Sequence, residues 1–425
     1  MRITDVTLTP ILIEDCPLLN VGGVHQPYAP RLVVEVHAED GTTGVGETYG
    51  DTTYLEIAEQ VAAEIVGRQL WETNLLTHSA ATVGGRQHAD TMAELNSGGF
   101  RGRVTAGKQR ASVTSAFEVA CLDALGKSLG LPVHALLGGK VRDRVDYSAY
   151  LFYKWSAHPD PDAPEDGWGE VVDPDGVVRL AHTFLDRYGF KSIKLKGGAF
   201  PPQEEVAAIA ALHEEFPDHP LRLDPNGAWS VDTAVKVAED TREMLEYLED
   251  PTLDTSGMSE VRRRTGVTLA TNMCVTTFDE IPEAFAGDAV QVVLSDHHYW
   301  GGLDATAKLA AVCRPWSVAV SMHSNTHLGV SLAAMTHVAA TIPELHYACD
   351  THRPWQYEDI ITEPHRFTDG ALEVDDRPGL GIELDRDAMA RLHERWTGSD
   401  VRERDDVAAM KRARPGWEPS GFPKW

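Results

Sequence analysis

Eight short apolar segments constrain the fold of this chain more than any other feature of its sequence. From about residue 145 they alternate with helix-like stretches, the pattern of βα repetition in a parallel sheet. The segments are residues 146–152, 191–196, 221–226, 245–250, 267–272, 290–296, 317–324 and 345–350. Eight parallel strands are the number that closes a TIM barrel. The sequence therefore predicts an α/β fold, a modified (β/α)8 TIM barrel, for residues 141–366.

The residues on either side of the barrel follow a different pattern. Apolar and β-branched residues predict strands near the start of the chain, and helical periodicity follows them. The strand patterns cover residues 2–14 and 30–41, and the helical patterns cover residues 52–67 and 112–130. We expect residues 1–140 to form an α+β capping domain that residues 367–425 complete. Residues 155–178 lack periodicity and are predicted to be an insertion loop after the first barrel strand.

The net charge of −27 on 425 residues limits the class of partner. Such an acidic chain repels nucleic acid and anionic membrane surfaces, and no basic run offsets the charge. No window approaches the roughly 20 apolar residues that span a bilayer. We therefore expect a small-molecule partner, with no nucleic acid and no membrane.

The cysteines and the N-terminus indicate the compartment. The N-terminus lacks a basic region followed by an apolar core, so no secretory signal is expected. The cysteines are odd in number and lie far apart in apolar segments, which is typical of reduced core thiols in a cytoplasmic protein. They are Cys16, Cys121, Cys274, Cys313 and Cys349.

Polar or charged residues end almost every predicted barrel strand. Barrel enzymes place their catalytic groups at the carboxyl ends of the strands, whereas a purely structural barrel has no reason to repeat such a pattern. The residues are Tyr150, Lys194, Lys196, Asp224, Asn226, Glu249, Asp250, Asn272, Asp296, His323, Asp350 and His352. They are the candidates for an active site at the barrel mouth.

Lys194 and Lys196 are two residues apart on one predicted strand, so both ammonium groups face the barrel mouth. Like-charge repulsion should lower the pKa of each lysine, which helps one of them to act as a base near neutral pH. The alternative interpretation is a solvated surface pair, because a lone Lys-x-Lys is common.

Asp224, Glu249 and Asn272 end three consecutive predicted strands. Three oxygen donors that converge on one point, with water or substrate completing the shell, are a typical Mg²⁺ site. The bound ion would polarise a substrate carboxylate. Each residue alone could instead be a loop cap, but three successive strand ends are harder to explain in that way.

Asp296 ends the sixth predicted strand and His323 ends the seventh. The carboxylate can accept the Nδ1 hydrogen of the histidine and leave Nε2 as a base directed at substrate. His323 alone could also be a structural histidine with satisfied hydrogen bonds. His297, His298 and His327 lie nearby in sequence, and the sequence assigns them no chemistry beyond contact with substrate.

Together these groups describe abstraction of a proton beside a carboxylate. The metal would stabilise the enediolate oxygens, and a lysine and a histidine would serve as bases on opposite faces of the α-carbon. Because the α-proton of a carboxylate is weakly acidic, a base without a metal would not suffice.

At these residues the sequence resembles the enolase superfamily, and within it the glucarate dehydratase group. The resemblance spans nearly the whole chain, and ATNM and HSNTH are its most discriminating motifs. The main matching stretches are KLKGG (194–198), DPNGAW (224–229), EDP (249–251), ATNM (270–273), HSNTHLGVSLAAMTHVAA (323–340) and DTHRPWQ (350–356).

The resemblance implies dehydration of a hexarate to a keto-deoxy acid by a Mg²⁺-dependent enzyme, expected to be a homo-oligomer. It implies that Lys196 and His323 are the two bases, that Lys194 stabilises the enediolate and that Asp296 orients His323. Asp224, Glu249 and Asn272 would be the metal ligands. The implied substrate contacts are His25, Tyr150, Asn226, Asn325, His352 and Arg404.

Three other functions stay open at the level of sequence. The substrate could be galactarate, altrarate, idarate or another aldarate or aldonate instead of glucarate. Opposed lysine and histidine bases would also suit an acid-sugar racemase or epimerase. A non-catalytic barrel that binds a metal or a sugar acid would require the polar strand ends to be incidental.

Overall fold

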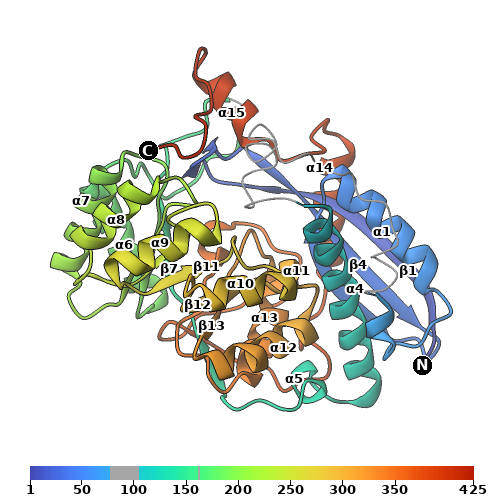
Figure 1. The fold of residues 1–425 in the computed structure, drawn as a ribbon. Coiled ribbons are helices and arrows are strands. Elements are labelled where there is room, and N and C mark those ends of the chain that lie inside the picture. Colours follow the sequence, from blue (N-terminus) through green and yellow to red (C-terminus); the bar gives the residue numbers. More distant parts are fainter. Residues whose placement is uncertain (77–104, 161–162) are drawn as a thin grey trace.

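The computed structural model describes residues 1–76, 105–160 and 163–425, and Figure 1 shows a barrel beside an antiparallel sheet. Seven parallel strands of the barrel are neighbours in chain order. They are β7 (Ala149–Phe152), β8 (Ile193–Lys196), β9 (Leu221–Asp224), β10 (Leu245–Glu249), β11 (Leu269–Thr271), β12 (Val292–Ser295) and β13 (Ala319–Met322). Each lies inside one of the first seven predicted segments, so the predicted α/β barrel is confirmed.

The eighth predicted segment, residues 345–350, closes the ring through isolated bridges and not as a regular strand. Leu345 pairs in parallel with Val320 of β13, and Cys349 pairs in parallel with Tyr147 just before β7. The segment therefore joins both edges of the seven-stranded sheet. Its carboxyl end lies at the barrel mouth with the others.

Helices on the outside of the barrel connect the strands. They are α6 (Pro174–Tyr188), α7 (Pro202–Glu215), α8 (Val231–Asp240), α9 (Thr255–Thr265), α10 (Ile281–Ala286), α11 (His297–Trp300), α12 (Leu303–Cys313) and α13 (Gly329–Thr341). Asp173, Ser230 and Asp254 begin α6, α8 and α9, because each side chain accepts the backbone N–H three residues later. The predicted loop 155–178 ends earlier than expected, since the Asp173 cap and Pro174 start α6 at residue 174.

The capping domain contains an antiparallel sheet in the order β1-β4-β5. Its strands and helices are β1 (Ile3–Glu14), β4 (Tyr28–Ala38), β5 (Thr43–Tyr49), α1 (Thr52–Ile65) and α4 (Ala106–Leu129). The C-terminal helix α14 (Arg386–Thr397) packs against β1, and His393 Nδ1 lies 2.7 Å from the carbonyl oxygen of Pro10. The C-terminal segment therefore contacts the first sheet, while the predicted domain boundaries stay a prediction.

Two glycines allow β5 to lie directly against α4. A Cβ atom on Gly44 would lie 2.0 Å from the carbonyl oxygen of Ala120, and one on Gly46 would lie 1.9 Å from that of Ala116. A side chain at either position would force the helix away from the strand. Glu47, the next residue, is consequently buried between the capping sheet and the barrel.

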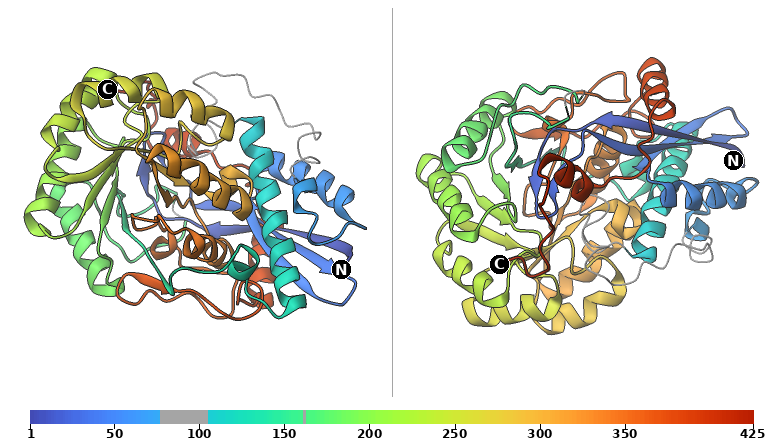
Figure 2. Two further views of the ribbon diagram at one scale, coloured as in Figure 1. Left: turned by 60° about the horizontal axis from the view of Figure 1, so that its bottom comes forward. Right: turned by 90° about the horizontal axis from the view of Figure 1, so that it is seen from above.

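Two segments from distant parts of the sequence lie side by side next to the barrel. The strands β2 (Leu19–Asn20) and β3 (Gly23–Val24) form a short hairpin, and α15 (Asp406–Ala413) lies next to it (Figure 2). The Leu19 N–H donates to the carbonyl oxygen of Tyr153 at 2.7 Å. Asn20 Nδ2 donates to Asp406 Oδ2 at 3.1 Å. Segments nearly 400 residues apart thus cover the same side of the barrel.

Two further expectations concern the whole chain. All five cysteines are free and buried, as predicted. In the part of the chain that the structure describes, no helix combines the length and the apolar character needed to cross a membrane.

One hydrophobic cluster extends from Ile11 and Val33 of the capping sheet to Val293 in the barrel.

Candidate active site

The carboxyl ends of four neighbouring strands gather lysines and oxygen donors. Lys194 and Lys196 lie on β8, Asp224 ends β9, Glu249 ends β10 and Asn272 follows β11 directly. All five residues are at most 7% exposed. The structure therefore brings the predicted lysine pair and the predicted metal ligands together.

Lys194 is enclosed by carboxylates. Its Nζ lies 2.6 Å from Glu249 Oε2, 2.7 Å from Asp350 Oδ2 and 3.5 Å from Asp224 Oδ2. Burial alone would lower the pKa of Lys194, but Asp350 and Glu249 outweigh it and raise that pKa well above the ordinary lysine value. The prediction of a lowered pKa is wrong for this lysine, because its acidic neighbours outnumber Lys196. Lys194 stays a cation at neutral pH.

Lys196 lies between Asp224 and Asn226. Its Nζ donates to Asp224 Oδ2 at 2.6 Å and to Asn226 Oδ1 at 2.9 Å. Asn226 has a φ of 59°, a left-handed conformation that asparagine tolerates. Burial disfavours the charged form of Asp224, but Lys196 and Lys194 overcome this effect and lower its pKa to about 2. Asp224 is therefore an anionic oxygen donor at neutral pH.

The donors of Asp224, Glu249 and Asn272 fit a Mg²⁺ ion. They offer two carboxylates and an amide carbonyl, the hard oxygens that this ion prefers. Asn272 Nδ2 donates to Glu249 Oε1 at 2.5 Å. Glu249 Oε2 contacts the Lys194 ammonium at 2.6 Å. Burial and the nearby Asp224 raise the pKa of Glu249 well above its ordinary value, and a divalent cation would relieve this repulsion.

Asp250, the other acid of the EDP motif, is directed elsewhere. Thr271 Oγ1 donates to Asp250 Oδ1 at 2.5 Å, and the Asn272 N–H donates to Asp250 Oδ2 at 2.8 Å. Its φ of 37° is unusual for a residue with a side chain. Asp250 therefore fixes the backbone that carries Asn272, and Glu249 is the acid in contact with the lysine.

The predicted histidine–carboxylate pair is formed. Asp296 follows β12 and His323 follows β13, with His323 Nδ1 at 3.1 Å from Asp296 Oδ2. Because a carboxylate only accepts hydrogen bonds, Nδ1 carries the hydrogen and Nε2 is left as a base. Burial lowers the pKa of His323 below its ordinary value, although Asp296 acts in the opposite direction. His323 is therefore neutral near pH 7.

Four predicted substrate contacts lie around these groups. Asn226 accepts from Lys196, and Tyr150 OH donates to Asp224 Oδ2 at 3.5 Å. The His352 ring lies 4.9 Å from that of Tyr150, and burial followed by the nearby His323 lowers the pKa of His352 well below its ordinary value. Asn325 Nδ2 donates to the Tyr299 hydroxyl at 3.4 Å and is only partly buried.

The other two predicted contacts, His25 and Arg404, belong to an ion-pair network beneath the β2–β3 hairpin. His25 Nδ1 lies 3.1 Å from Asp15 Oδ2, and Arg404 Nη1 lies 3.5 Å from the same oxygen. Arg404 Nε also donates to Asp406 Oδ1 at 3.2 Å. The His25 ring faces Phe152 of β7, with 6.1 Å between ring centres. Asp15 and Asp406 thus already compensate the Arg404 charge.

Sequence reasoning missed the contact of Asp350 with Lys194 and that of Arg222 with Asp350. Asp350 was recognised as a polar strand end but received no role, and it lies 2.7 Å from the lysine. Arg222, a charged residue inside β9, lies 3.6 Å from Asp350 Oδ1. A charged residue within an apolar strand was the available signal for Arg222. Its partner could not be read because the eighth segment is far from β9 in sequence.

Two family models match most of the chain. Residues 176–388 match the family described as Enolase C-terminal domain-like, and residues 18–138 match the N-terminal domain of mandelate racemase and muconate lactonizing enzyme. The chain belongs to the enolase superfamily. The predicted membership is therefore confirmed.

Relatives cover the full length of this enolase-superfamily chain. It is 63% identical over 428 aligned residues to a probable glucarate dehydratase of Streptomyces coelicolor, with 100% of this chain and 99% of the relative covered. An enolase of Thermobispora bispora complexed with magnesium and formate has a TM-score of 0.93 at 47% identity, covering 100% of both chains. An enolase of Pseudomonas fluorescens with bound magnesium, potassium and tartrate has a TM-score of 0.94 at 45% identity, covering 100% and 99%.

Proposed function

We propose that this chain is a Mg²⁺-dependent hydro-lyase that dehydrates an acid sugar, with glucarate as its substrate. The observation that carries the proposal is the distribution of groups around the barrel. β8 bears the lysines and β12 precedes Asp296, and these are the second and sixth of eight strands. In a closed ring of eight, such strands lie across from each other, and the oxygen donors end the strands between them. The full-length similarity to a probable glucarate dehydratase supports the substrate.

The reaction begins with loss of the proton α to a carboxylate. Lys196 Nζ takes this proton from one face of the α-carbon or His323 Nε2 takes it from the other, according to which epimer is bound. The electron pair of the C–H bond then forms a carbon–carbon double bond as the β-hydroxyl leaves. A protonated base supplies the hydrogen that makes the leaving group water, and the enol product tautomerises to a keto-deoxy acid. When bound, Mg²⁺ supplies a Lewis acid for the charge that develops on the carboxylate.

The remaining residues hold and orient these groups. Lys194 stays charged and stabilises the developing negative charge, while Asp296 orients His323. Asp224, Glu249 and Asn272 would hold the metal. The proposed substrate contacts are His25, Tyr150, Asn226, Asn325, His352 and Arg404.

Product analysis tests the reaction. We expect glucarate and Mg²⁺ to give a keto-deoxy acid that semicarbazide traps, measured by absorbance across a panel of acid sugars. Turnover of only galactarate, altrarate or idarate would change the substrate and keep the reaction. An epimerised sugar without keto product would replace the dehydratase by a racemase or epimerase. No reaction with any acid sugar would contradict the proposed enzyme class.

Metal removal tests the oxygen-donor site. Exhaustive EDTA treatment should abolish turnover, and Mg²⁺ should restore it. Mg²⁺ at about 100 times its Kd should also stabilise the folded protein by about 2.7 kcal/mol, which thermal unfolding detects without an activity assay. The Asp224→Asn variant should lose most of this stabilisation. Full turnover of the EDTA-treated protein would remove the metal from the mechanism.

We also propose a binding partner and a cellular compartment for this enzyme. The tartrate bound to the Pseudomonas fluorescens enolase supports a dicarboxylate sugar acid as the small-molecule partner here. The five free, buried cysteines support a cytoplasmic enzyme. Homo-oligomerisation stays a prediction, which light scattering or sedimentation can check.

A further inference from the structure

We propose that His298 is a positioning residue that ties the Asp296 carboxylate, and through it the base His323, to capping strand β5. The inference rests on the proposed function, because it extends the role given there to His323. His298 lies in α11, the short helix that begins directly after Asp296. Its ring is fully buried and has a hydrogen-bond partner at each nitrogen.

His298 and His323 bind different oxygens of Asp296. Oδ1 accepts the backbone N–H of His298 at 3.0 Å and faces the Nδ1 of that ring at 2.9 Å. Oδ2 faces His323 Nδ1 at 3.1 Å. A carboxylate held at Oδ1 cannot rotate without breaking these bonds. His298 therefore keeps Oδ2 in line with His323 and fixes the histidine tautomer that leaves Nε2 as the base.

The other end of the His298 ring reaches the capping domain. Nε2 lies 2.9 Å from the carbonyl oxygen of Glu47 in β5 and 3.2 Å from Ser331 Oγ. The Glu47 carboxylate accepts the backbone N–H groups of Leu328 at 2.9 Å and Ser331 at 3.0 Å, at the start of α13. One capping residue thus holds both His298 and the helix that follows the His323 loop.

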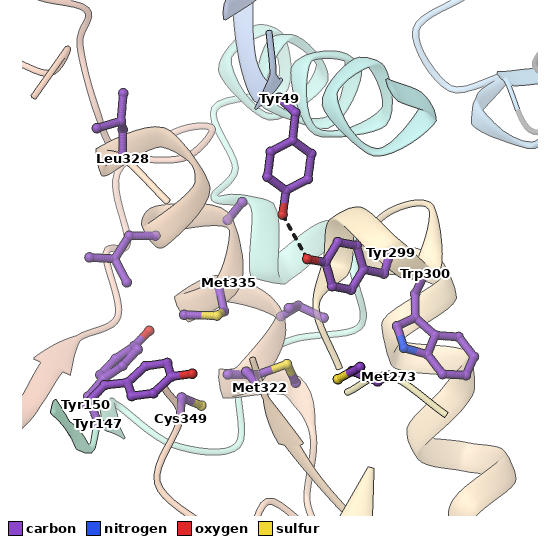
Figure 3. Close-up of a cluster of buried hydrophobic side chains, with 14 of the residues drawn as sticks. Tyr49, Tyr147, Tyr150, Met273, Tyr299, Trp300, Met322, Leu328, Met335 and Cys349 are labelled. Carbon is purple, nitrogen blue, oxygen red and sulfur yellow. Dashed lines mark hydrogen bonds between the residues drawn. The ribbon is translucent and has the colours of Figure 1, made fainter. Parts of the chain in front are cut away.

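A second contact from β5 reaches the same side of the site. Tyr49 OH donates to the Tyr299 hydroxyl at 3.2 Å, and Figure 3 shows the two side chains meeting between the capping strand and the barrel. The Tyr299 ring stacks on His323 with 5.9 Å between ring centres. Lys196 lies on β8, across the ring of strands. Strand β5 therefore supports the His323 side of the site, whereas Lys196 is held by β8.

The same cluster could be taken for a second metal site, because ligand atoms of Asp296, His297, His298 and His327 lie within 4.8 Å of one another. Two observations argue against this. Both nitrogens of His298 already have hydrogen-bond partners. The buried guanidinium of Arg31 also acts on His297 and His327, and positive charge beside these rings disfavours another cation. The hydrogen-bond arrangement favours positioning.

Two substitutions distinguish the contact at Nδ1 of His298 from the contact at Nε2. The amide of His298→Asn reaches the place of Nδ1 and retains a bond to Asp296, but it is too short for the Glu47 carbonyl. The longer amide of His298→Gln reaches towards Glu47 and leaves Asp296 Oδ1.

The rate of exchange of the α-proton with ²H₂O is measured for the two substrate epimers, each of which is served by one of the two bases. Exchange by His323 should fall roughly tenfold or more in His298→Gln and less in His298→Asn, whereas exchange by Lys196 and both KM values should not change.

Three reference variants make the result decisive. His323→Asn and Lys196→Ala establish which epimer each base serves, so a failure of these two to separate the epimers contradicts the proposed function itself. His297→Gln alters an equally buried neighbouring ring whose Nδ1 has no hydrogen-bond partner, and it should leave the ratio of the two exchange rates unchanged. Parallel loss of both exchange reactions in His298→Gln, or no loss of either, overturns the positioning role.

Discussion

Lys196→Ala and His323→Asn should each abolish proton exchange with one epimer of the acid sugar and retain it with the other. Lys196 lies on β8, the second barrel strand, and His323 follows β13, the seventh, so we expect each base to approach a different face of the α-carbon. Positioned general bases contribute roughly 10²–10⁴-fold, and the affected epimer should lose exchange by about that factor. Incorporation of deuterium at the α-carbon, followed by NMR in ²H₂O, measures both rates in the same protein.

Lys191→Ala is the matched control for the lysine variant. Lys191 lies on the same segment as Lys196 but is exposed, so its loss should change neither exchange rate. Unfolding midpoints of all three variants exclude general destabilisation as the cause. Equal loss of exchange with both epimers in Lys196→Ala and in His323→Asn would contradict the opposed-base geometry.

The sequence predicted the barrel well because its signal is local. Each strand is a short apolar run with a polar end, and seven of the eight runs contain a regular strand. The carboxyl ends of all parallel strands lie at the same end of a barrel. Polar residues at these strand ends therefore come together although they are far apart in sequence. For this reason the sequence alone groups Asp224, Glu249 and Asn272 as one donor set. The same logic placed Asp296 beside His323.

The electrostatics of the lysines could not be predicted in the same way. The spacing of Lys194 and Lys196 showed one repulsion between two cations. It did not show that Asp350, from the last barrel segment, and Glu249 lie within 2.7 Å of the Lys194 ammonium. The sign of a pKa shift depends on all charges near a buried group, and most of these neighbours are distant in sequence.

The contacts of the capping domain with the active site could not be predicted from the sequence either. Glu47 contacts Leu328 and Ser331, which are almost 300 residues away, and periodicity carries no information about such a contact. The role of Gly44 and Gly46 in bringing β5 against α4 likewise depends on a helix far away in sequence. His298 was visible as one of several histidines near Asp296. Only its backbone position in α11 shows why its ring bonds to that carboxylate.

Asn272→Asp should bind Mg²⁺ at least as tightly as the parent protein and turn over at least about tenfold more slowly. The substitution adds a third negative charge to the donor set, which strengthens its attraction for the ion. The same charge opposes the negative charge that develops on the substrate. Two unit charges about 4 Å apart interact by about 4 kcal/mol at an effective dielectric near 20, so even a third of this effect lowers turnover about tenfold. Steady-state kinetics and Mg²⁺ titration give both quantities.

Without the ion, the same variant should be less stable than the parent. Asn272 Nδ2 donates to Glu249 Oε1 at 2.5 Å, and an aspartate would replace this bond by repulsion between buried carboxylates. The unfolding midpoint in EDTA should therefore fall, and the gain on adding Mg²⁺ should exceed that of the parent. Asn272→Ala separates the causes, since it removes the ligand oxygen and should weaken Mg²⁺ binding as well as turnover. An Asn272→Asp variant with unchanged metal affinity and unchanged turnover would mean that residue 272 does not touch the ion.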